Sequence, residues 1–333
     1  MTSLHVTFSA DPRDFQRRDW TELVDLDPAG TIFHTPEYLK LYWEEFGEGR
    51  LLLAFGEAEP DRRQTAAVAF EVTGDVLRFL GGTEVTDYLG PVADPVVTES
   101  FARGVVLALA ERDDWARADL RGLPEDSPWL PALRRAWTDV GLAVEETEDQ
   151  NGVAPSLDLP ETWEGYLQDL PSKLRHEIRR KAKKLEAGVG PYDVVTATEE
   201  SLLPFLDRFV ELHHESEGPK GVFMVPGMEI FFRRLGEEFC SRGVFRLTFI
   251  RLGGELAAGT IGFVSGGTYS LYNSAFDRRW QHLAPGMVLV AEDIRQAIAE
   301  GCRRFDLLKG DYPYKYRFGA RGRAIRRLVV VRR

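Results

Sequence analysis

The sequence is poor in the residues and patterns that mark several large protein classes. Its 333 residues include only two cysteines, Cys240 and Cys302, which are too few for a disulfide framework and lack a spacing that suits zinc. No stretch approaches the run of about 18 apolar residues that spans a membrane. Residues 1–15 lack the charged-then-apolar pattern of a secretory signal. We therefore expect a soluble, cytoplasmic protein without a metal site.

Common catalytic motifs are also missing. There is no Gly-x-x-x-x-Gly-Lys-[Ser/Thr] phosphate loop and no Gly-x-Gly-x-x-Gly that opens a helix after a strand. No nucleophile has an adjacent histidine base. The adjacent His213 and His214 would not converge on one ion if they lie on a helix. These absences disfavour NTPases, Rossmann dehydrogenases and hydrolases with a serine or cysteine nucleophile.

Charge is divided unequally along the chain. Residues 1–170 hold 14 Lys and Arg against 34 Asp and Glu, whereas residues 171–333 hold 28 against 19. The net charge of -11 is therefore the sum of an acidic half and a basic half. A dispersed cation excess serves only solubility, but a focused one would attract a phosphorylated ligand.

The order of predicted elements repeats. At this length two hydrophobic cores are expected. Each half shows helices, three strand-like runs, a helix and a strand; the runs are "RLLLAFGE", "TAAVAFEV" and "DVLRFLGG", then "VFRLTFIRL", "ELAAGTIGFV" and "TYSLYNSAF". The repeat predicts an α/β protein with a mixed sheet, built from two copies of one fold at residues 1–155 and 156–333.

Helix boundaries follow from capping signals. One helix is predicted from Pro12 to Leu26. Thr35 is a plausible N-cap before Pro36, and this second helix should run to Phe46. A basic helix should run over residues 172–187 and end at Gly188.

The basic helix should bury a narrow stripe, because Leu174, Ile178, Ala182 and Leu185 share one side at 100° per residue. Positive charge in its first turn opposes the helix dipole, so either the acidic first domain or an anionic ligand such as a phosphate is expected to compensate it. A solvated basic face is the alternative. The cations form two rows, Arg175, Arg179 and Lys183 on one flank and Lys173, Arg180 and Lys184 on the other.

Two further segments suggest chemistry. The helix predicted from Gly286 opens with "GMVL", which has neither carboxylate nor cap, so its N–H groups are open to a phosphate, although it equally fits an ordinary helix start. The loop "KGDYPYKYRFGA", residues 309–320, supplies a possible base, acid and electrostatic stabiliser, unless it is only a tyrosine-rich turn packed on a sheet. Its candidate residues are Asp311, Tyr314, Lys315, Tyr316 and Arg317.

Several segments together resemble a known family. "LPSKLRHEIRRKAKKLE" and "YNSAFDRRWQHLAPGMVLVAEDIRQAIAEGCRRFDLLKGDYPYKYRFGA" are similar to the CelD-type acyltransferase domain, and "FHTPEYLKLYWEEFG" and "TEVTDYLGPV" resemble its N-terminal motifs. This branch of the GNAT superfamily is associated with cellulose and exopolysaccharide pathways. It is in turn similar to the Fem peptidyltransferases, which place two GNAT folds side by side with a cleft between them.

The resemblance assigns roles to individual residues. Lys315 matches a lysine thought to stabilise the oxyanion, and Asp87 and Tyr88 match a first-domain pair that faces the cleft. The basic helix, through Arg175, Arg179 and Lys183, would lie near the acceptor or a phosphate. The loop from Gln281 to Met287 takes the place of the GNAT pyrophosphate loop but lacks its usual Gly-x-Gly. Donor-binding residues would be Asn273, Ser274, Arg278, Arg279, Pro285, Gly286 and Met287.

The resulting prediction is an N-acyltransferase that moves an acyl group, acetyl being expected, from acyl-CoA to a small amine or amino sugar. Asp311 or Asp87 would take the amine proton, and Tyr314 or Tyr316 would return one to the thiolate. Tyr88 and Arg317 would contact the acceptor.

Two alternatives remain open. A Fem-like transferase would take its aminoacyl group from charged tRNA, which the net charge of -11 disfavours. A degenerate GNAT pair would serve as a non-catalytic binding module, which the missing Gly-x-Gly favours.

Overall fold

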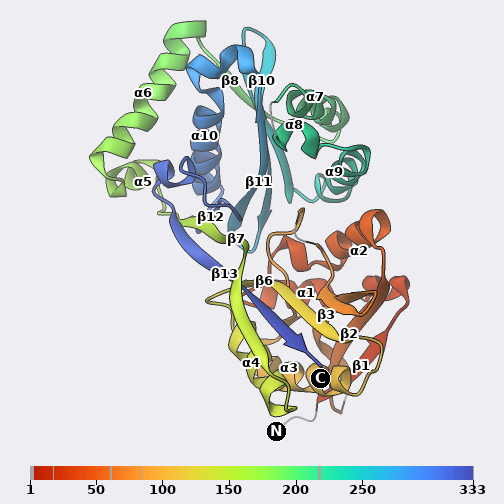
Figure 1. The fold of residues 1–333 in the computed structure, drawn as a ribbon. Coiled ribbons are helices and arrows are strands. Elements are labelled where there is room, and N and C mark those ends of the chain that lie inside the picture. Colours follow the sequence, from red (N-terminus) through yellow and green to blue (C-terminus); the bar gives the residue numbers. More distant parts are fainter. Residues whose placement is uncertain (1–3, 18, 61, 83, 217–218, 333) are drawn as a thin grey trace. The chain divides into compact units, whose positions relative to one another are not determined.

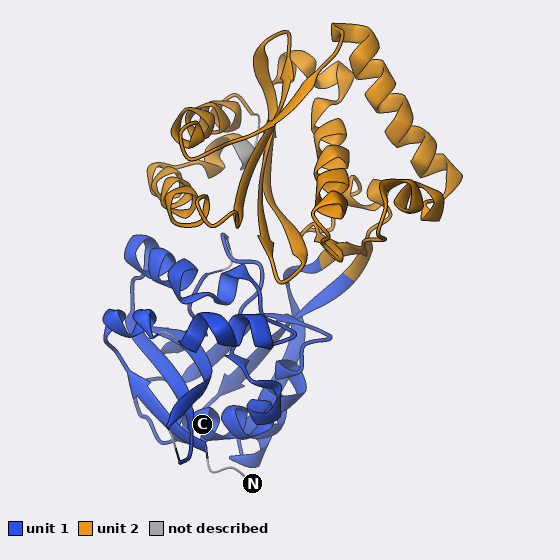
Figure 2. Ribbon diagram, turned by 180° about the vertical axis from the view of Figure 1, so that it is seen from behind, with its two compact units in different colours: residues 1–153, 323–333 blue, residues 154–322 orange. Residues whose placement is uncertain are grey.

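The computed structural model describes residues 4–17, 19–60, 62–82, 84–216 and 219–332. It divides into two compact units, which Figure 2 shows in different colours. Unit 1 comprises Met1–Val153 and Arg323–Arg333, and unit 2 comprises Ala154–Gly322. The last residues therefore pack in unit 1, whereas the sequence placed them in a second domain over residues 156–333.

Unit 1 is built on a mixed sheet with the strand order β1-β2-β3-β4-β6-β13-β7, to which β5 adds beside β3. Strands β1 to β4 are antiparallel neighbours, and β4 pairs in parallel with β6. The strands are β1 (Leu4–Ser9), β2 (Arg50–Ala58), β3 (Arg63–Thr73), β4 (Val76–Phe79), β5 (Val92–Ala93), β6 (Arg117–Pro124), β7 (Val144–Asp158) and β13 (Arg321–Val331).

Apolar residues of the helices and strands form one large core in unit 1. Thr35 caps α2 as predicted, because its hydroxyl accepts a hydrogen bond from the Tyr38 N–H at 3.3 Å. The prediction of one continuous helix from Pro12 to Leu26 is wrong, because Arg17 has an extended backbone and separates the short helix η1 from α1. The helices are η1 (Pro12–Gln16), α1 (Asp19–Leu26), η2 (Ile32–His34), α2 (Pro36–Phe46), η3 (Pro95–Val97), α3 (Thr98–Ala110) and α4 (Trp129–Asp139).

Unit 2 repeats this plan. Its strand order is β7-β12-β11-β10-β9-β8. The meander β9-β10-β11 is antiparallel, and β11 then pairs in parallel with β12, as β4 does with β6. The new strands are β8 (Asp193–Thr196), β9 (Phe245–Leu252), β10 (Glu255–Ser265), β11 (Thr268–Phe276) and β12 (Arg304–Asp306).

Helices cover both faces of this sheet, with α10 and α6 on one face and α7 and α9 on the other (Figure 1). Ile294 and Leu289 of α10 are fully buried on the first face, and Phe209 of α7 and Phe231 of α9 on the second. The helices are α5 (Trp163–Asp169), α6 (Ser172–Val189), α7 (Leu202–His214), α8 (Pro219–Phe223), α9 (Pro226–Phe239), η4 (Arg278–Leu283), α10 (Pro285–Ala299) and η5 (Lys315–Phe318).

Two strands link distant parts of the sequence. The end of β7 pairs antiparallel with β12 in unit 2, and β13, at the end of the chain, pairs antiparallel with β6 in unit 1. In each unit, the strand beyond the meander thus pairs with a strand from elsewhere in the chain. The predicted α/β class with a mixed sheet and two copies of one fold is confirmed.

The basic helix α6 is longer than predicted. It continues to Val189, and Gly190, with φ of 82°, accepts the left-handed position after it. Gly188 lies inside the helix, where an added Cβ would come within 2.8 Å of the Leu283 side chain. This glycine therefore allows close packing on η4 instead of ending the helix. In the described ranges, no helix combines the length and apolar character needed to cross a membrane.

Candidate active site

Strands β11 and β12 separate after a short parallel pairing. Only residues 268–270 of β11 pair with residues 304–306 of β12. The chain then turns away from the sheet, since the Asp306 carboxylate accepts the Leu308 N–H at 2.8 Å and Leu308 has a left-handed φ of 60°. Within the part of the chain that the structure describes, β11 continues from Leu271 to Phe276 with β10 as its only strand neighbour.

A β-bulge shapes this free stretch of β11. The register shifts so that Ile261 faces Asn273 and Gly262 faces Leu271, which leaves Tyr272 as the extra residue. Tyr272 stacks on Phe232 of α9 with ring centroids 5.4 Å apart. Tyr272 and Asn273 therefore both face α7 and α9, although they are consecutive.

Asn273 is held by a buried histidine. Its Oδ1 accepts the Ser274 backbone N–H at 2.7 Å and lies 3.1 Å from His213 Nε2. Because an amide oxygen can only accept, Nε2 carries the hydrogen. His213 is 1% exposed. The backbone N–H of Ser274, one of the predicted donor-binding residues, thus already has an intramolecular acceptor.

The segment between β11 and α10 reaches an uncapped helix start. Ala284 is left-handed, with φ of 56° and ψ of 50°, and Pro285 occupies the first turn. Among the described residues, no side chain caps α10, and its first turn holds no carboxylate. Gly286 and Met287 are half-buried at this end. The predicted opening for an anion is therefore present in the geometry.

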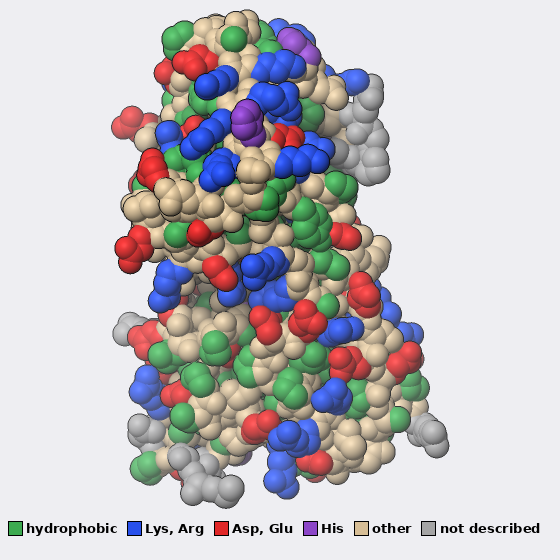
Figure 3. Space-filling model, turned by 90° about the vertical axis from the view of Figure 1, so that its left-hand side faces the viewer, with side chains coloured by type: hydrophobic (Ala, Val, Ile, Leu, Met, Phe, Trp, Pro, Cys, Tyr) green, Lys and Arg blue, Asp and Glu red, His purple; other side chains and the backbone are tan. Residues whose placement is uncertain are grey.

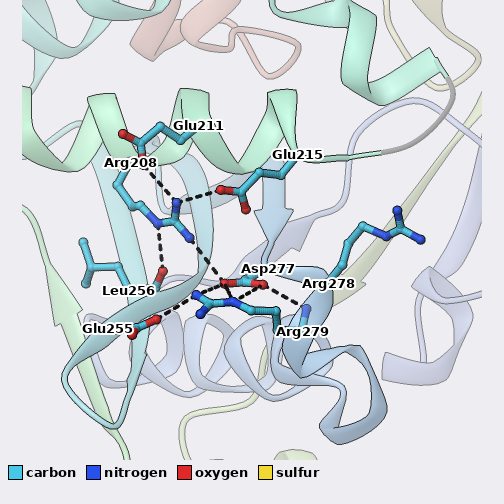
Figure 4. A pocket seen from close by; sticks show the side chains of 8 residues that line it. All are labelled: Arg208, Glu211, Glu215, Glu255, Leu256, Asp277, Arg278 and Arg279. Atoms are coloured by element: carbon cyan, nitrogen blue, oxygen red, sulfur yellow. Dashed lines mark hydrogen bonds and ion pairs between the residues drawn. The ribbon is translucent and has the colours of Figure 1, made fainter.

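A charged pocket of about 690 Å³ lies at the end of β11 (Figure 4). Arg208 of α7 donates to the Leu256 carbonyl at 3.2 Å and to Glu211 at 2.9 Å, and it lies 3.5 Å from Asp277. The pocket is lined by Arg208, Glu211, Glu215, Glu255, Leu256, Asp277, Arg278 and Arg279.

Asp277 is the centre of this network. It is 3% exposed, and its side chain accepts the Arg279 N–H as the N-cap of η4. Hydrogen bonding from the Arg279 side chain lowers the pKa of Asp277, so the carboxylate stays ionised. Arg279 also reaches Glu255 at 2.7 Å. The guanidinium of Arg279, which was predicted to bind the donor, is therefore paired with two carboxylates. This network fixes the segment that leads into α10.

The predicted catalytic loop contains both buried and exposed groups. Lys315 is 2% exposed, and its Nζ donates to the carbonyls of Leu308 and Lys309, each at 2.7 Å. Tyr314 is half-buried, and burial raises its pKa to about 12. The amine of Lys315 thus donates hydrogen bonds to two backbone carbonyls in the turn after β12.

Asp311 and Tyr316 form the accessible part of the loop. The Tyr316 hydroxyl donates to Asp311 Oδ1, and this hydrogen bond raises the pKa of Tyr316. Asp311 is exposed. Arg317 lies 3.4 Å from Glu177 of α6, which ties the loop to the basic helix.

The other predicted residues are more dispersed. Arg175 is half-buried and donates to the Leu167 carbonyl at 3.4 Å, whereas Arg179 and Lys183 lie on the exposed side of α6. Asp87 and Tyr88 belong to unit 1, where Tyr88 is 1% exposed and Arg323 lies over its ring. Every other predicted site residue belongs to unit 2.

Sequence reasoning missed four polar groups of unit 2. His213 was considered only as a metal ligand, and its contact across to β11 leaves no local signal. Arg208 and Asp277 are 69 residues apart, so their pairing was not visible either. Asp293 offered a signal, because it interrupts the apolar side of "MVLVAEDIRQAI" at helical spacing.

Comparisons with known proteins support an acyltransferase fold. Residues 172–316 match a family model described as an acetyltransferase (GNAT) domain. No curated protein matches the sequence significantly.

Solved structures align over almost the entire chain. A crystal structure of FemX has a TM-score of 0.66 at 8% identity, with 97% of this chain and 96% of that chain covered. L-PGS from Bacillus licheniformis has a TM-score of 0.59 at 14% identity, with coverage of 97% and 92%. A tandem GNAT protein from the clavulanic acid biosynthesis pathway has a TM-score of 0.50 at 12% identity, with 98% of each chain covered.

At these identities the likeness to solved structures concerns the fold. The narrower CelD-type assignment stays a prediction. The chain has the mixed α/β fold of tandem GNAT proteins, and residues 172–316 are similar to a GNAT acetyltransferase domain.

Proposed function

We propose that this protein is an N-acyltransferase that transfers an acyl group, acetyl in the first instance, from acyl-CoA to an amine. The observation that carries the proposal is the free stretch of β11, residues 271–276, beside the uncapped start of α10. An extended donor can lie along a strand that is paired on one edge only, and its phosphates can accept hydrogen bonds from helix N–H groups. Both features belong to unit 2, within the matched GNAT domain.

The donor's phosphates would lie at Gly286 and Met287. Pro285 sets the first turn, and the absence of a carboxylate there, among the described residues, leaves the helix dipole available to an anion. Arg278, exposed at the pocket rim, would add positive charge. Arg279 has the supporting role of holding Asp277 and η4.

The thioester would lie against the bulge of β11. There, His213 orients Asn273, and Ser274 lies in the part of β11 that follows its short pairing with β12. The side chain of Asn273 contributes by fixing the bulge, since its oxygen is occupied by two donors.

Asp311 and Tyr316 are the pair we assign to proton transfer. The amine attacks the thioester carbonyl, and its proton passes to Asp311 directly or through water. When the carbon–sulfur bond breaks, the thiolate takes the Tyr316 proton, and Tyr316 regains one from Asp311 through their hydrogen bond. Tyr316 is protonated at neutral pH, since its pKa lies above the ordinary tyrosine value, and so it has a proton to give. Tyr314 is the alternative proton donor, and the role of Asp87 stays a prediction from the family resemblance.

Lys315 would act indirectly, without contacting the reacting atoms. Its amine holds the carbonyls of Leu308 and Lys309, and so it sets the shape of the loop that carries Asp311. Direct stabilisation of the oxyanion, as the resemblance implies, would require the amine to leave these two acceptors.

The acceptor follows only from the family. A GNAT acceptor is an amine, and an amino sugar of a polysaccharide or cell-envelope pathway is the proposal that the CelD-type resemblance supports.

A pair of substitutions tests the donor site. Gly286 leaves room for a methyl group, because an added Cβ would lie 3.8 Å from Phe276. Gly286→Ala should therefore keep acetyl-CoA affinity, whereas Gly286→Asp should reduce it about tenfold or more by placing a carboxylate against the phosphates. Isothermal titration of wild type and both variants decides this.

Two outcomes would contradict the donor assignment. Equal acetyl-CoA affinities for the two variants would show that the donor's phosphates do not bind at the start of α10. Binding of charged tRNA without any binding of acetyl-CoA would favour the Fem-like alternative.

A further inference from the structure

The cations of α6 differ from most other arginines of unit 2 in having no carboxylate partner. The helix holds seven Lys and Arg residues in its 18 positions. None of the seven lies within ion-pair distance of a carboxylate of the described residues. Elsewhere in unit 2 such pairs are the rule, as in Arg208, Arg233, Arg242, Arg246, Arg279 and Arg295.

Five of the seven cations share one side of the helix, and one of them, Lys184, also donates to the His282 carbonyl at 2.6 Å. Ile178 and Leu185 are buried against unit 2, which turns the opposite side of α6 to solvent. At 100° per residue, an outward arc of about 140° contains no carboxylate. Figure 3 faces this side and shows Lys and Arg side chains gathered over the upper part of the view. We call this the basic arc; its members, all exposed, are Lys173, His176, Arg179, Arg180, Lys183 and Lys184.

The carboxylates of α6 do not neutralise the basic arc. Glu177 lies just beyond one edge of the arc and pairs with Arg317 of η5, and Glu186 lies just beyond the other edge without an ion pair to a described residue. Burial lowers the pKa of Lys181, Glu177 opposes this, and the neighbouring charges of Arg180, Arg317 and Lys184 lower it further. Like charges are thus crowded on this helix at a cost that solubility in a protein of net charge -11 does not require.

We propose that the basic arc is a docking surface for an anionic lipid membrane. The arc covers about 16 Å from Lys173 to Lys184, and its charges are spread over the outward side, which suits a planar array of phosphates. It carries no large exposed apolar side chain, so it rests on lipid headgroups without inserting. This inference is independent of the proposed function.

Charge chemistry favours a membrane over nucleic acid as the partner. Recognition of nucleic acid normally adds aromatic side chains that stack on bases or amide side chains that read them. The basic arc has neither. Attraction to an anionic membrane requires only Lys and Arg near its surface, and the charge acts locally because screening limits its range to about 8 Å at physiological salt.

Vesicle sedimentation tests the proposal with matched variants. The probe is phosphatidylcholine vesicles with and without about 30% phosphatidylserine, in salt from about 50 mM to about 500 mM. The test variant is Arg179→Gln, Arg180→Gln and Lys183→Gln together. The control removes the same charge from exposed positions of unit 1 by Arg103→Gln, Arg117→Gln and Arg135→Gln.

The wild type should sediment with anionic vesicles only, and high salt should release it. Each cation near the surface is worth about a fivefold change in partition, so the test variant should bind about a hundredfold more weakly. The control should bind like the wild type. A charge-preserving variant, Arg179→Lys with Arg180→Lys, should also bind anionic vesicles. Its binding would show that the test variant fails through loss of charge and not through loss of fold.

Three results would overturn the proposal. The first is failure of the wild type to sediment with anionic vesicles at low salt. The second is equal weakening of vesicle binding in the test and control variants, which would show that binding depends on the net charge of the protein and not on the basic arc. The third is binding of duplex RNA through the basic arc with indifference to vesicles, which would make the partner a nucleic acid.

Discussion

Asp293 should make unit 2 less stable as pH rises, and replacing it should remove that dependence. The residue lies on α10 with 3% exposure, and its Oδ2 has no hydrogen-bond partner among the described residues. Burial, opposed by hydrogen bonds from Thr260 and Tyr269 and aided by the charge of Glu292, raises its pKa from 3.8 to about 7. A carboxylate is thus held where its neutral form is favoured.

The sign and size follow from proton linkage. Between the unfolded pKa of 3.8 and the folded pKa of about 7, the folded state binds one proton more than the unfolded state. Stability therefore falls by about 1.4 kcal/mol for each pH unit in this window and levels off above it. From about pH 5 to about pH 8 the loss sums to about 3 kcal/mol.

Asp293→Asn should not show this loss. Native-state hydrogen exchange of the α10 amides reports the opening of unit 2 itself, so the free energy of opening should fall by about 3 kcal/mol in the wild type relative to the variant across that range. Asp158→Asn serves as control, because its carboxylate is 90% exposed and should leave the wild-type slope unchanged. Parallel pH profiles for wild type and Asp293→Asn would refute the reasoning.

Three further predictions concern the proposed reaction. Tyr316→Phe should lower turnover about 100-fold or more, whereas Tyr314→Phe should change it less than about tenfold, because only the first hydroxyl is linked to Asp311; equal effects in a steady-state assay would contradict the assignment. Lys315→Ala should reduce both turnover and the free energy of unfolding, the latter by about 1–3 kcal/mol, since two carbonyls lose their donor; unchanged turnover would exclude Lys315 from the site. Arg208→Met should weaken acetyl-CoA binding about tenfold by loosening η4, and the double variant with Asp277→Asn should add little; fully additive losses would show that the two do not act together.

The sequence predicted elements whose signals are local. The Thr35-Pro36 start of α2 depends on a cap and a proline that act within four residues. The meander of β9, β10 and β11 was predicted because its strands are joined by Gly-Gly turns, at Gly253-Gly254 and Gly266-Gly267, all four with positive φ. The apolar stripe of α6 was also predicted, and its central members, Ile178 and Leu185, are buried.

Features that depend on distant contacts were not predicted. The pairing of β13 with β6 joins segments about 200 residues apart, and nothing in a local pattern specifies it. Gly188 was interpreted as a helix end because glycine usually ends helices, whereas here it serves contact with Leu283. The burial of Lys315 was missed for the same reason, since its acceptors depend on the turn after β12.

The central claim is that an acyl-CoA donor lies between the free stretch of β11 and the start of α10. Hydrogen exchange with and without acetyl-CoA tests this most directly. The account predicts slower exchange at residues 271–276 and 286–288, with the meander edge at β8 unchanged. Slower exchange confined to other segments, or none at saturating acetyl-CoA, would contradict it.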